Sequence, residues 1–242
     1  MGISERFQGK SALRTACAAV AVAAVVSFSA GMAKAANVVV DFSGFSEGDV
    51  LNGAFNFGGG VTGTISTSAL SNSATGEAMV FDTIAPSSSV NNDPDLRGPF
   101  TNVNDSQDIR DFGNVLILQE KNNNNPDDAA GGGAITFTFD QVVSLTRIFL
   151  LDGNDNTPTG GSIFLDGSAT ALATNLGGGD RQFEEFVFAP NTFVSSFTVD
   201  FAGSGAIGRF GFAAVPVPAT LPLLLTGLGA VAWAARRRKR TV

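Results

Sequence analysis

The sequence lacks the side chains that carry most catalytic and metal chemistry in proteins. It contains no histidine and no tyrosine, one cysteine (Cys17) and one tryptophan (Trp233). The absence of histidine excludes a Ser-His triad and an ordinary zinc site. A single cysteine cannot form an intrachain disulfide, so apolar packing must stabilise the folded chain.

Basic side chains are also scarce between the two ends. Residues 36–219 contain six Lys or Arg residues against 21 Asp or Glu residues, a net charge of −15 compared with −7 for the whole chain. Such a surface repels nucleic acid and anionic lipid, and it attracts divalent cations. We therefore expect no nucleic-acid partner.

The first 35 residues have the order of a secretory signal peptide. Residues 1–14 carry a net positive charge, residues 15–32 are uncharged and rich in alanine and valine, and Ala33 and Ala35 form a small-x-small cleavage site. We expect signal peptidase to cut after Ala35, with a cut one residue later as the alternative.

The other end, residues 215–242, combines a proline motif, an apolar run and a basic cluster. Residues 219–235 hold no charged side chain, and five cations follow: Arg236, Arg237, Arg238, Lys239 and Arg240. This order is a stop-transfer pattern that keeps the cations on the cytoplasmic side. The 15 residues from Leu221 to Ala235 would span roughly 22 Å as a helix, less than the hydrocarbon core of about 30 Å. We expect a transmembrane helix over residues 219–235 that anchors the chain only temporarily.

The motif itself is Val215, Pro216, Val217, Pro218 and Ala219, followed by LPLLLTGLGA and then RRRKR. This tail resembles the PEP-CTERM family of bacterial sorting signals, in its VPLPA variant, which has leucine where Val217 stands. The resemblance implies a substrate of an exosortase, a membrane enzyme of Gram-negative envelopes that cuts near the proline motif and passes the ectodomain onward. The protein would then be exported across the inner membrane, anchored for a time, and delivered to the envelope, the cell surface or the medium. An ordinary C-terminal anchor is the alternative.

Between the two ends, short runs alternate between apolar and polar residues, and no stretch has a sustained helical period. Phe197, Val199 and Phe201, for example, would face inward, with Thr198 and Asp200 outward. The predicted strands are 38–42, 54–57, 62–69, 78–82, 115–120, 134–140, 143–151, 162–166, 171–175, 182–188, 197–201 and 209–213. This spacing predicts an all-β ectodomain over residues 36–214, a single β-sandwich of jelly-roll type.

Apolar side chains fill the interior of this predicted sandwich. The residues predicted for the core are Phe137, Phe139, Phe149, Phe186, Phe188, Phe197, Val199 and Phe201. Residues 115–118 and 148–151 are continuously apolar, which predicts burial on both faces. Polar loops are expected at 86–111, 120–133 and 152–161, where they serve either for binding or as plain surface insertions.

The segments DFSGFSEGDVLNGAFNFGGGVTGT, GNVLILQE and ITFTFDQVVSLTRIFLLD are similar to galactose-binding-like jelly rolls and carbohydrate-binding modules, which are often joined to PEP-CTERM tails. The resemblance implies a structural calcium ion that joins an acid near the first strand to one on the last. Asp41 or Glu47 would then pair with Asp200.

Calcium binds six to eight oxygen atoms, so clustered Asp and Asn side chains are candidate ligands. Asp152, Asn154 and Asp155 stand close together in one predicted loop. They do not complete an EF-hand, because the required glycine and glutamate are missing. The alternative is that these residues simply form turns.

A glycosidase would need two acids facing one another across a cleft. Glu120 is the best single acid, whereas the adjacent Glu184 and Glu185 should point to opposite faces of a strand. We therefore expect no enzyme. The leading interpretation is an exported, non-catalytic protein of the envelope or extracellular matrix, with exosortase and signal peptidase as partners. The alternative is a calcium-dependent carbohydrate-binding module of the cell surface or biofilm matrix, with an extracellular polysaccharide as partner.

Overall fold

The computed structural model describes residues 36–69, 74–84, 94–120, 125–153 and 160–215. The predicted signal peptide with Ala33 and Ala35, the transmembrane segment and the basic cluster lie outside these ranges. So do the candidate ligands Asn154 and Asp155 and the motif residues that follow Val215.

The described part of the chain is all-β and contains no helix. No helix in it is therefore long and apolar enough to cross a membrane. Within the described ranges the strands are β1 (Asn37–Val40), β2 (Gly53–Gly58), β3 (Val61–Ala69), β4 (Ala74–Asp82), β5 (Phe100–Asn102), β6 (Asp105–Arg110), β7 (Asn114–Glu120), β8 (Gly133–Leu151), β9 (Gly161–Leu165), β10 (Ala173–Leu176), β11 (Gln182–Phe201) and β12 (Ala206–Ala214).

The fold is organised by two long antiparallel strands, β8 and β11, which pair from one end to the other. Phe201 pairs with Gly133 at one end of this ribbon, and Phe183 pairs with Leu151 at the other. The register shifts between Val187 and Thr192, where the ribbon turns. Each long strand contains two of the predicted strands, and every other predicted strand overlaps an observed one.

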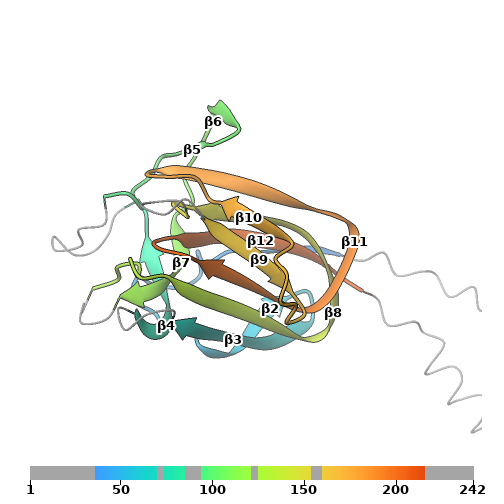
Figure 1. The fold of residues 1–242 in the computed structure, drawn as a ribbon. Coiled ribbons are helices and arrows are strands. Elements are labelled where there is room, and N and C mark those ends of the chain that lie inside the picture. Colours follow the sequence, from blue (N-terminus) through green and yellow to red (C-terminus); the bar gives the residue numbers. More distant parts are fainter. Residues whose placement is uncertain (1–35, 70–73, 85–93, 121–124, 154–159, 216–242) are drawn as a thin grey trace, which may run out of the picture. The chain divides into compact units, whose positions relative to one another are not determined.

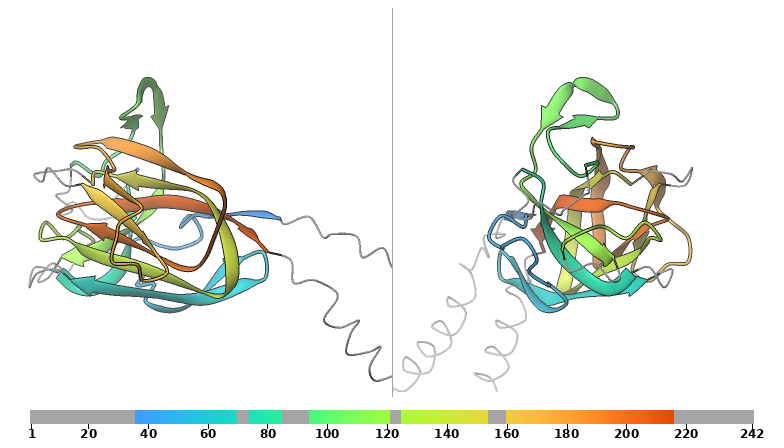
Figure 2. Two further views of the ribbon diagram at one scale, coloured as in Figure 1. Left: turned by 45° about the vertical axis from the view of Figure 1, so that its right-hand side comes forward. Right: turned by 90° about the vertical axis from the view of Figure 1, so that its left-hand side faces the viewer.

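The turn in the ribbon divides its neighbours into two groups. β3 pairs with the first half of β8, and β9 pairs with the second half of β11. β12 pairs with the second half of β8 along one edge. Its other edge pairs first with β7, which leads on to β4, and further along with β1. The result is one sheet that curls on itself, as the two views in Figure 2 show.

The curled sheet encloses the main hydrophobic core. Its centre is a group of phenylalanine rings in mutual contact: Phe57, Phe137, Phe139, Phe197, Phe210 and Phe212. Six of the eight residues predicted for the core are buried in this main core, whereas Phe149 is buried on the other face of β8 and Phe186 is only partly buried. Phe186 packs edge-on against Phe188 at 5.1 Å between ring centroids.

A second, smaller core lies on the other face of β7, β8 and β12. Leu116 and Ile148 face the main core, whereas Val115, Ile117 and Phe149 belong to the second core. Both continuously apolar runs are therefore buried on both faces, as predicted. Part of the cover for this second face comes from the segment that carries Leu96, Phe100 and Phe112.

The expected loop at 86–111 is partly wrong, because it contains β5 and β6. These strands form a hairpin that stands away from the sheet in Figure 1, and β5 pairs in parallel with the start of β11. β6 reads DSQDIR, with polar side chains on both faces. It therefore lacks the apolar alternation by which a strand is recognised in a sequence.

Candidate functional site: a groove lined by arginines

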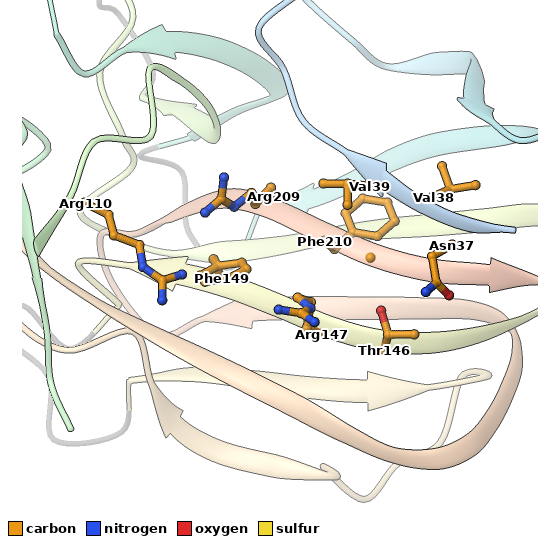
Figure 3. Close-up of a pocket in the computed structure, with 10 residues that line it drawn as sticks. Asn37, Val38, Val39, Arg110, Thr146, Arg147, Phe149, Arg209 and Phe210 are labelled. Atoms are coloured by element: carbon orange, nitrogen blue, oxygen red, sulfur yellow. The ribbon is translucent and has the colours of Figure 1, made fainter. Parts of the chain in front are cut away.

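An open groove lies across β1, β12 and the second half of β8, with a volume of about 390 Å³. Its lining residues are Asn37, Val38, Val39, Arg110, Thr146, Arg147, Phe149, Arg209, Phe210 and Gly211. Three of the six basic residues between positions 36 and 219 therefore converge on one place. Figure 3 shows the three arginine side chains arranged around Phe149.

Strand register explains why these side chains meet. Arg209 on β12 pairs with Phe149 on β8, and Gly211 pairs with Arg147 two residues further along. Side chains two positions apart on a strand share a face. Arg147 and Arg209 are therefore diagonal neighbours on the outer face of the sheet, a relation that typically separates side chains by about 7–8 Å.

Gly211 forms the floor of the groove because it has no side chain. A Cβ atom at this position would lie 2.7 Å from the Oγ1 atom of Thr146 and 3.4 Å from the Cγ atom of Arg147. The register of β8 and β12 shifts next to Gly211, which adds Thr146 as an unpaired residue on β8. Such a bulge redirects neighbouring side chains. Val39, 61% exposed, pairs with Gly211 on the other side.

Two of the guanidinium groups rest on aromatic rings. The Arg209 guanidinium carbon lies 4.7 Å from the centroid of Phe149 and 5.3 Å from that of Phe112. The Arg110 guanidinium lies 5.3 Å from Phe149 and 5.2 Å from Phe183. Stacking of this kind restricts the motion of an arginine side chain while leaving its N–H edge able to donate hydrogen bonds.

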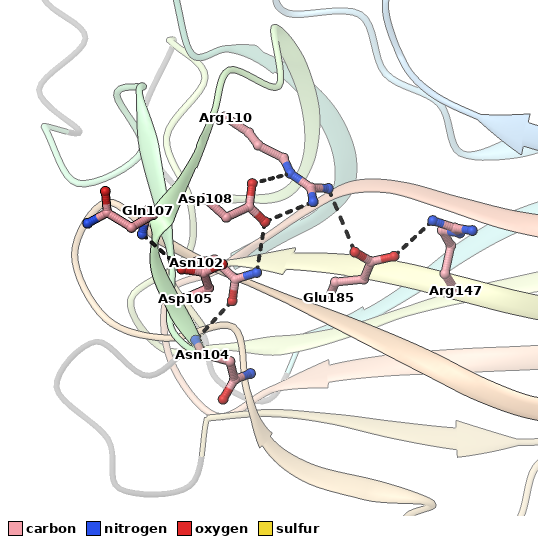
Figure 4. Close-up of polar contacts among 8 residues, drawn as sticks. All are labelled: Asn102, Asn104, Asp105, Gln107, Asp108, Arg110, Arg147 and Glu185. Atoms are coloured by element: carbon pink, nitrogen blue, oxygen red, sulfur yellow. Dashed lines mark hydrogen bonds and ion pairs between the residues drawn. The ribbon is translucent and has the colours of Figure 1, made fainter.

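Acidic residues neutralise the three arginines unequally, and Figure 4 shows the ion pairs of Arg110 and Arg147. Arg110 donates two hydrogen bonds to Asp108, at 2.7 and 2.8 Å. The carboxylate of Glu185 lies 3.0 Å from Arg147 and 3.7 Å from Arg110. Within the described ranges, the guanidinium group of Arg209 forms neither an ion pair nor a hydrogen bond. The groove thus holds three guanidinium groups against two carboxylates.

The pKa values follow the same pairing. The hydrogen bond from Arg110 is the main cause that lowers the pKa of Asp108 below its ordinary value, and the Asn102 amide adds to it. The same hydrogen bond raises the pKa of Arg110. Asp108 and Arg110 are therefore a charged pair over the whole physiological range.

The candidate calcium ligands are spread over the fold. Asp41 is exposed after β1 and accepts hydrogen bonds from Ser43, and Glu47 is partly exposed in the turn that follows. Asp152 is buried at the end of β8 with a positive φ of 52°. Among the residues that the structure describes, no three acidic side chains approach closely enough to hold a metal ion.

Asp200 was expected on the outer surface, but it is only partly exposed. Its Oδ1 atom is buried and has no hydrogen-bond partner in the described part of the chain. Burial raises the pKa of this carboxyl group, because it disfavours the charged form. Asp200 pairs with Ala134 and Ser162.

The arginine groove is not predicted from the residues, although two signals in the sequence point to part of it. Arg147 and Phe149 alternate on one predicted strand, and Arg209 and Gly211 alternate on another, so each pair shares a face. The outward position of Arg147 and Arg209 follows from the buried Ile148 and Phe210 beside them. Phe149, predicted for the sandwich core, instead lies on the outer face with Arg147. That the two strands are neighbours could not be read from the residues, because they are about 60 positions apart. In comparisons with known proteins, the chain matches no protein-family model and no curated protein.

Proposed function

We propose that this chain is an exported, non-catalytic protein of the bacterial envelope or extracellular matrix, sorted by an exosortase. Signal peptidase would remove residues 1–35, and the sorting enzyme would cut near Pro218. The domain that is delivered would be a β-sandwich of jelly-roll type. Two groups of strands joined by the turning β8–β11 ribbon, with phenylalanine rings between them, support that architecture.

The observation that carries this proposal is the order of segments after the last strand. β12 ends at Ala214, and the motif VPVPA begins at Val215, followed by the uncharged run and the five cations. The candidate cleavage motif therefore follows the folded domain directly. Cleavage there would release the domain without removing any strand.

Mass spectrometry of the exported protein tests the proposal. In a strain with a working exosortase, the C-terminus should lie near Pro218, and in a strain without the enzyme the tail should be intact. Replacing both Pro216 and Pro218 with alanine should prevent the cut. Replacing Pro190, which lies in β11 and outside the motif, should not. Recovery of the intact tail from the strain with the working enzyme would contradict the proposal.

A second candidate is a calcium-dependent carbohydrate-binding module, and the buried Oδ1 atom of Asp200 favours it. A carboxylate oxygen without a protein partner in the described ranges is a potential ligand for a cation. A glycan array run in calcium and again in chelator separates this function from a purely structural one. Binding that disappears in chelator would support the module.

A further inference from the structure

We propose that the arginine groove binds an acidic saccharide, with the sugar carboxylate between Arg147 and Arg209. Asn37 and Thr146 would hydrogen-bond the hydroxyl groups beside that carboxylate. This binding would use guanidinium groups in place of a metal ion. It would therefore persist in chelator, unlike the calcium-dependent module.

Charge distribution is the first support. A domain with a net charge of −15 repels anions over most of its surface. Three of its few cations nevertheless line one groove, where they outnumber the carboxylates. Like charges placed as close neighbours on one sheet face destabilise it unless a counter-charge is present. Glu185 provides that charge for Arg147, and nothing in the described ranges provides it for Arg209.

Geometry is the second support. Arg209 lies on the rings of Phe149 and Phe112 and so is held in place before any ligand arrives. Its planar fork suits the two oxygens of a carboxylate. Arg147, 55% exposed at its side chain, has a single short contact with Glu185 and keeps other N–H groups available. Arg110 is committed to Asp108, which leaves Arg147 and Arg209 as the pair for a ligand.

The remaining lining residues distinguish a saccharide from other anions. Asn37 offers an amide and Thr146 a hydroxyl, whereas Val39 offers apolar surface. A sugar acid presents a carboxylate, hydroxyl groups and C–H faces, so each kind of lining group finds a counterpart. A bare phosphate or sulfate would use the arginines alone. An acidic peptide lacks the row of hydroxyl groups that Asn37 and Thr146 could bind. A volume of about 390 Å³ lies within the range of small-ligand sites, about 300–1,000 Å³.

Of the two acids near these arginines in the fold, only Glu185 competes with the ligand. Glu185 holds Arg147, and a bound carboxylate would share that guanidinium rather than replace the acid. Asp41 follows β1 and would stand opposite Arg209 if the pairing of Val40 with Phe210 continued by one residue. Its Oδ1 atom instead accepts hydrogen bonds from the backbone and hydroxyl of Ser43. Arg209 therefore stays available.

This inference rests on the proposed function in one respect: the domain must be exported to a compartment that contains acidic glycans. The experiment uses the full chain in a neutral detergent, with polygalacturonate as the probe and dextran as the neutral control. Titration calorimetry in chelator should show binding to polygalacturonate and none to dextran. Arg209→Gln and Arg147→Gln should each weaken binding about 10- to 100-fold, the effect expected for loss of one charge-assisted hydrogen bond. Arg97→Gln removes the same charge outside the groove and should leave the affinity unchanged.

Several outcomes would overturn the proposal. One is no binding to polygalacturonate, and another is an equal loss of affinity in Arg97→Gln, which would indicate non-specific charge attraction. Tighter binding to poly-glutamate than to polygalacturonate would assign the groove to an acidic peptide. Arg209→Lys keeps the positive charge but loses the planar guanidinium group, so full affinity in that variant would also contradict the proposed carboxylate geometry.

Thermal unfolding of each variant shows whether it is folded, and the exposed Arg147→Gln variant tests the site independently of packing. An intact C-terminal tail would contradict exosortase sorting and would leave these titrations unaffected.

Discussion

The rings of Phe137 and Phe197 stack across the β8–β11 ribbon, with centroids 4.7 Å apart and planes only 16° from parallel. Phe197 is 1% exposed and also contacts Phe210 edge-on. Replacing Phe197 with alanine should lower the free energy of unfolding by about 3–5 kcal/mol, because it leaves a cavity at the centre of the main core. Urea denaturation of residues 36–214 measures this loss.

Phe193 is the matched control, because it lies on the same strand but is 52% exposed. Phe193→Ala should change the free energy of unfolding by less than about 1 kcal/mol. Equal urea midpoints for the two variants would show that the assigned inward face of β11 is wrong.

Asp166, directly after β9, is hydrogen-bonded to β11. Its Oδ1 atom accepts hydrogen bonds from the backbone amides of Ser195 and Ser196, at 2.8 and 2.9 Å, and from the Ser195 hydroxyl. Burial, the largest single influence, raises the pKa of Asp166, but the hydrogen bonds from the two serines outweigh it, so the pKa is lowered. The folded state therefore favours the carboxylate.

Asp166→Asn should destabilise the domain at pH 7 by about 1 kcal/mol, a modest value because the residue is exposed. The stability that Asp166 contributes is present above the unfolded pKa of about 3.9 and is lost as the pH falls through the lower folded pKa. The difference between wild type and Asp166→Asn, followed by urea denaturation from pH 7 to pH 3, should therefore shrink below about pH 4. A difference that stays constant to pH 3 would exclude this linkage.

Asp200 should show the opposite dependence on pH. Its folded pKa is raised, so the ionised group opposes folding above the unfolded pKa of about 3.9. Asp200→Asn should raise the free energy of unfolding at pH 7 by less than about 1 kcal/mol, because partial exposure screens the charge. This gain should vanish as the pH falls below about 4. Asp180→Asn, an exposed residue, is the control for loss of charge alone. Destabilisation at pH 7 would show that the Asp200 carboxylate has a stabilising partner.

Calcium should stabilise the domain if the predicted ligands form a site. A ligand at 100 times its Kd adds about 2.7 kcal/mol, and each kcal/mol raises the Tm of a domain of this size by roughly 2–4 °C. Melting curves in millimolar calcium and in chelator measure the shift, with magnesium as the control for screening. Loss of the shift in Asp200→Asn would assign it to the candidate site with Asp41 or Glu47, and loss in Asp152→Asn would assign it to the loop that begins at Asp152. Identical curves for the wild type would reject a site in the folded state.

The sequence predicts the strands well because one-sided burial leaves a period of two. The alternation of Ile135, Phe137 and Phe139 with threonines identifies the face that packs against Phe197. Alternation carries no information about which strands are neighbours. Four predicted strands therefore become the two long strands β8 and β11, and only the structure shows that they pair along their whole length.

The arginine groove could be predicted only in part for the same reason. Alternation assigns Arg147 and Arg209 to outward faces, but their proximity depends on the pairing of β8 with β12. The third arginine, Arg110, ends β6, whose polar sequence DSQDIR gives no strand signal. Asp200 shows another limit: its strand position is outward, yet neighbouring chain segments cover part of it.

The position of β12 in the sheet also constrains the order in which the strands can pair during folding. β12 comes last in the chain, yet it lies between β8 and β7 and also pairs with β1. During synthesis, β7 and β8 cannot pair with β12 until the last strand of the chain has been made. The pairing of β1 with β12 joins the first strand to the last and is therefore delayed the most. Closure of the sheet is therefore a late event, governed by contacts distant in sequence. The proline motif directly follows the strand that completes the sheet, so a cut at the motif made before closure would still leave every strand in the product.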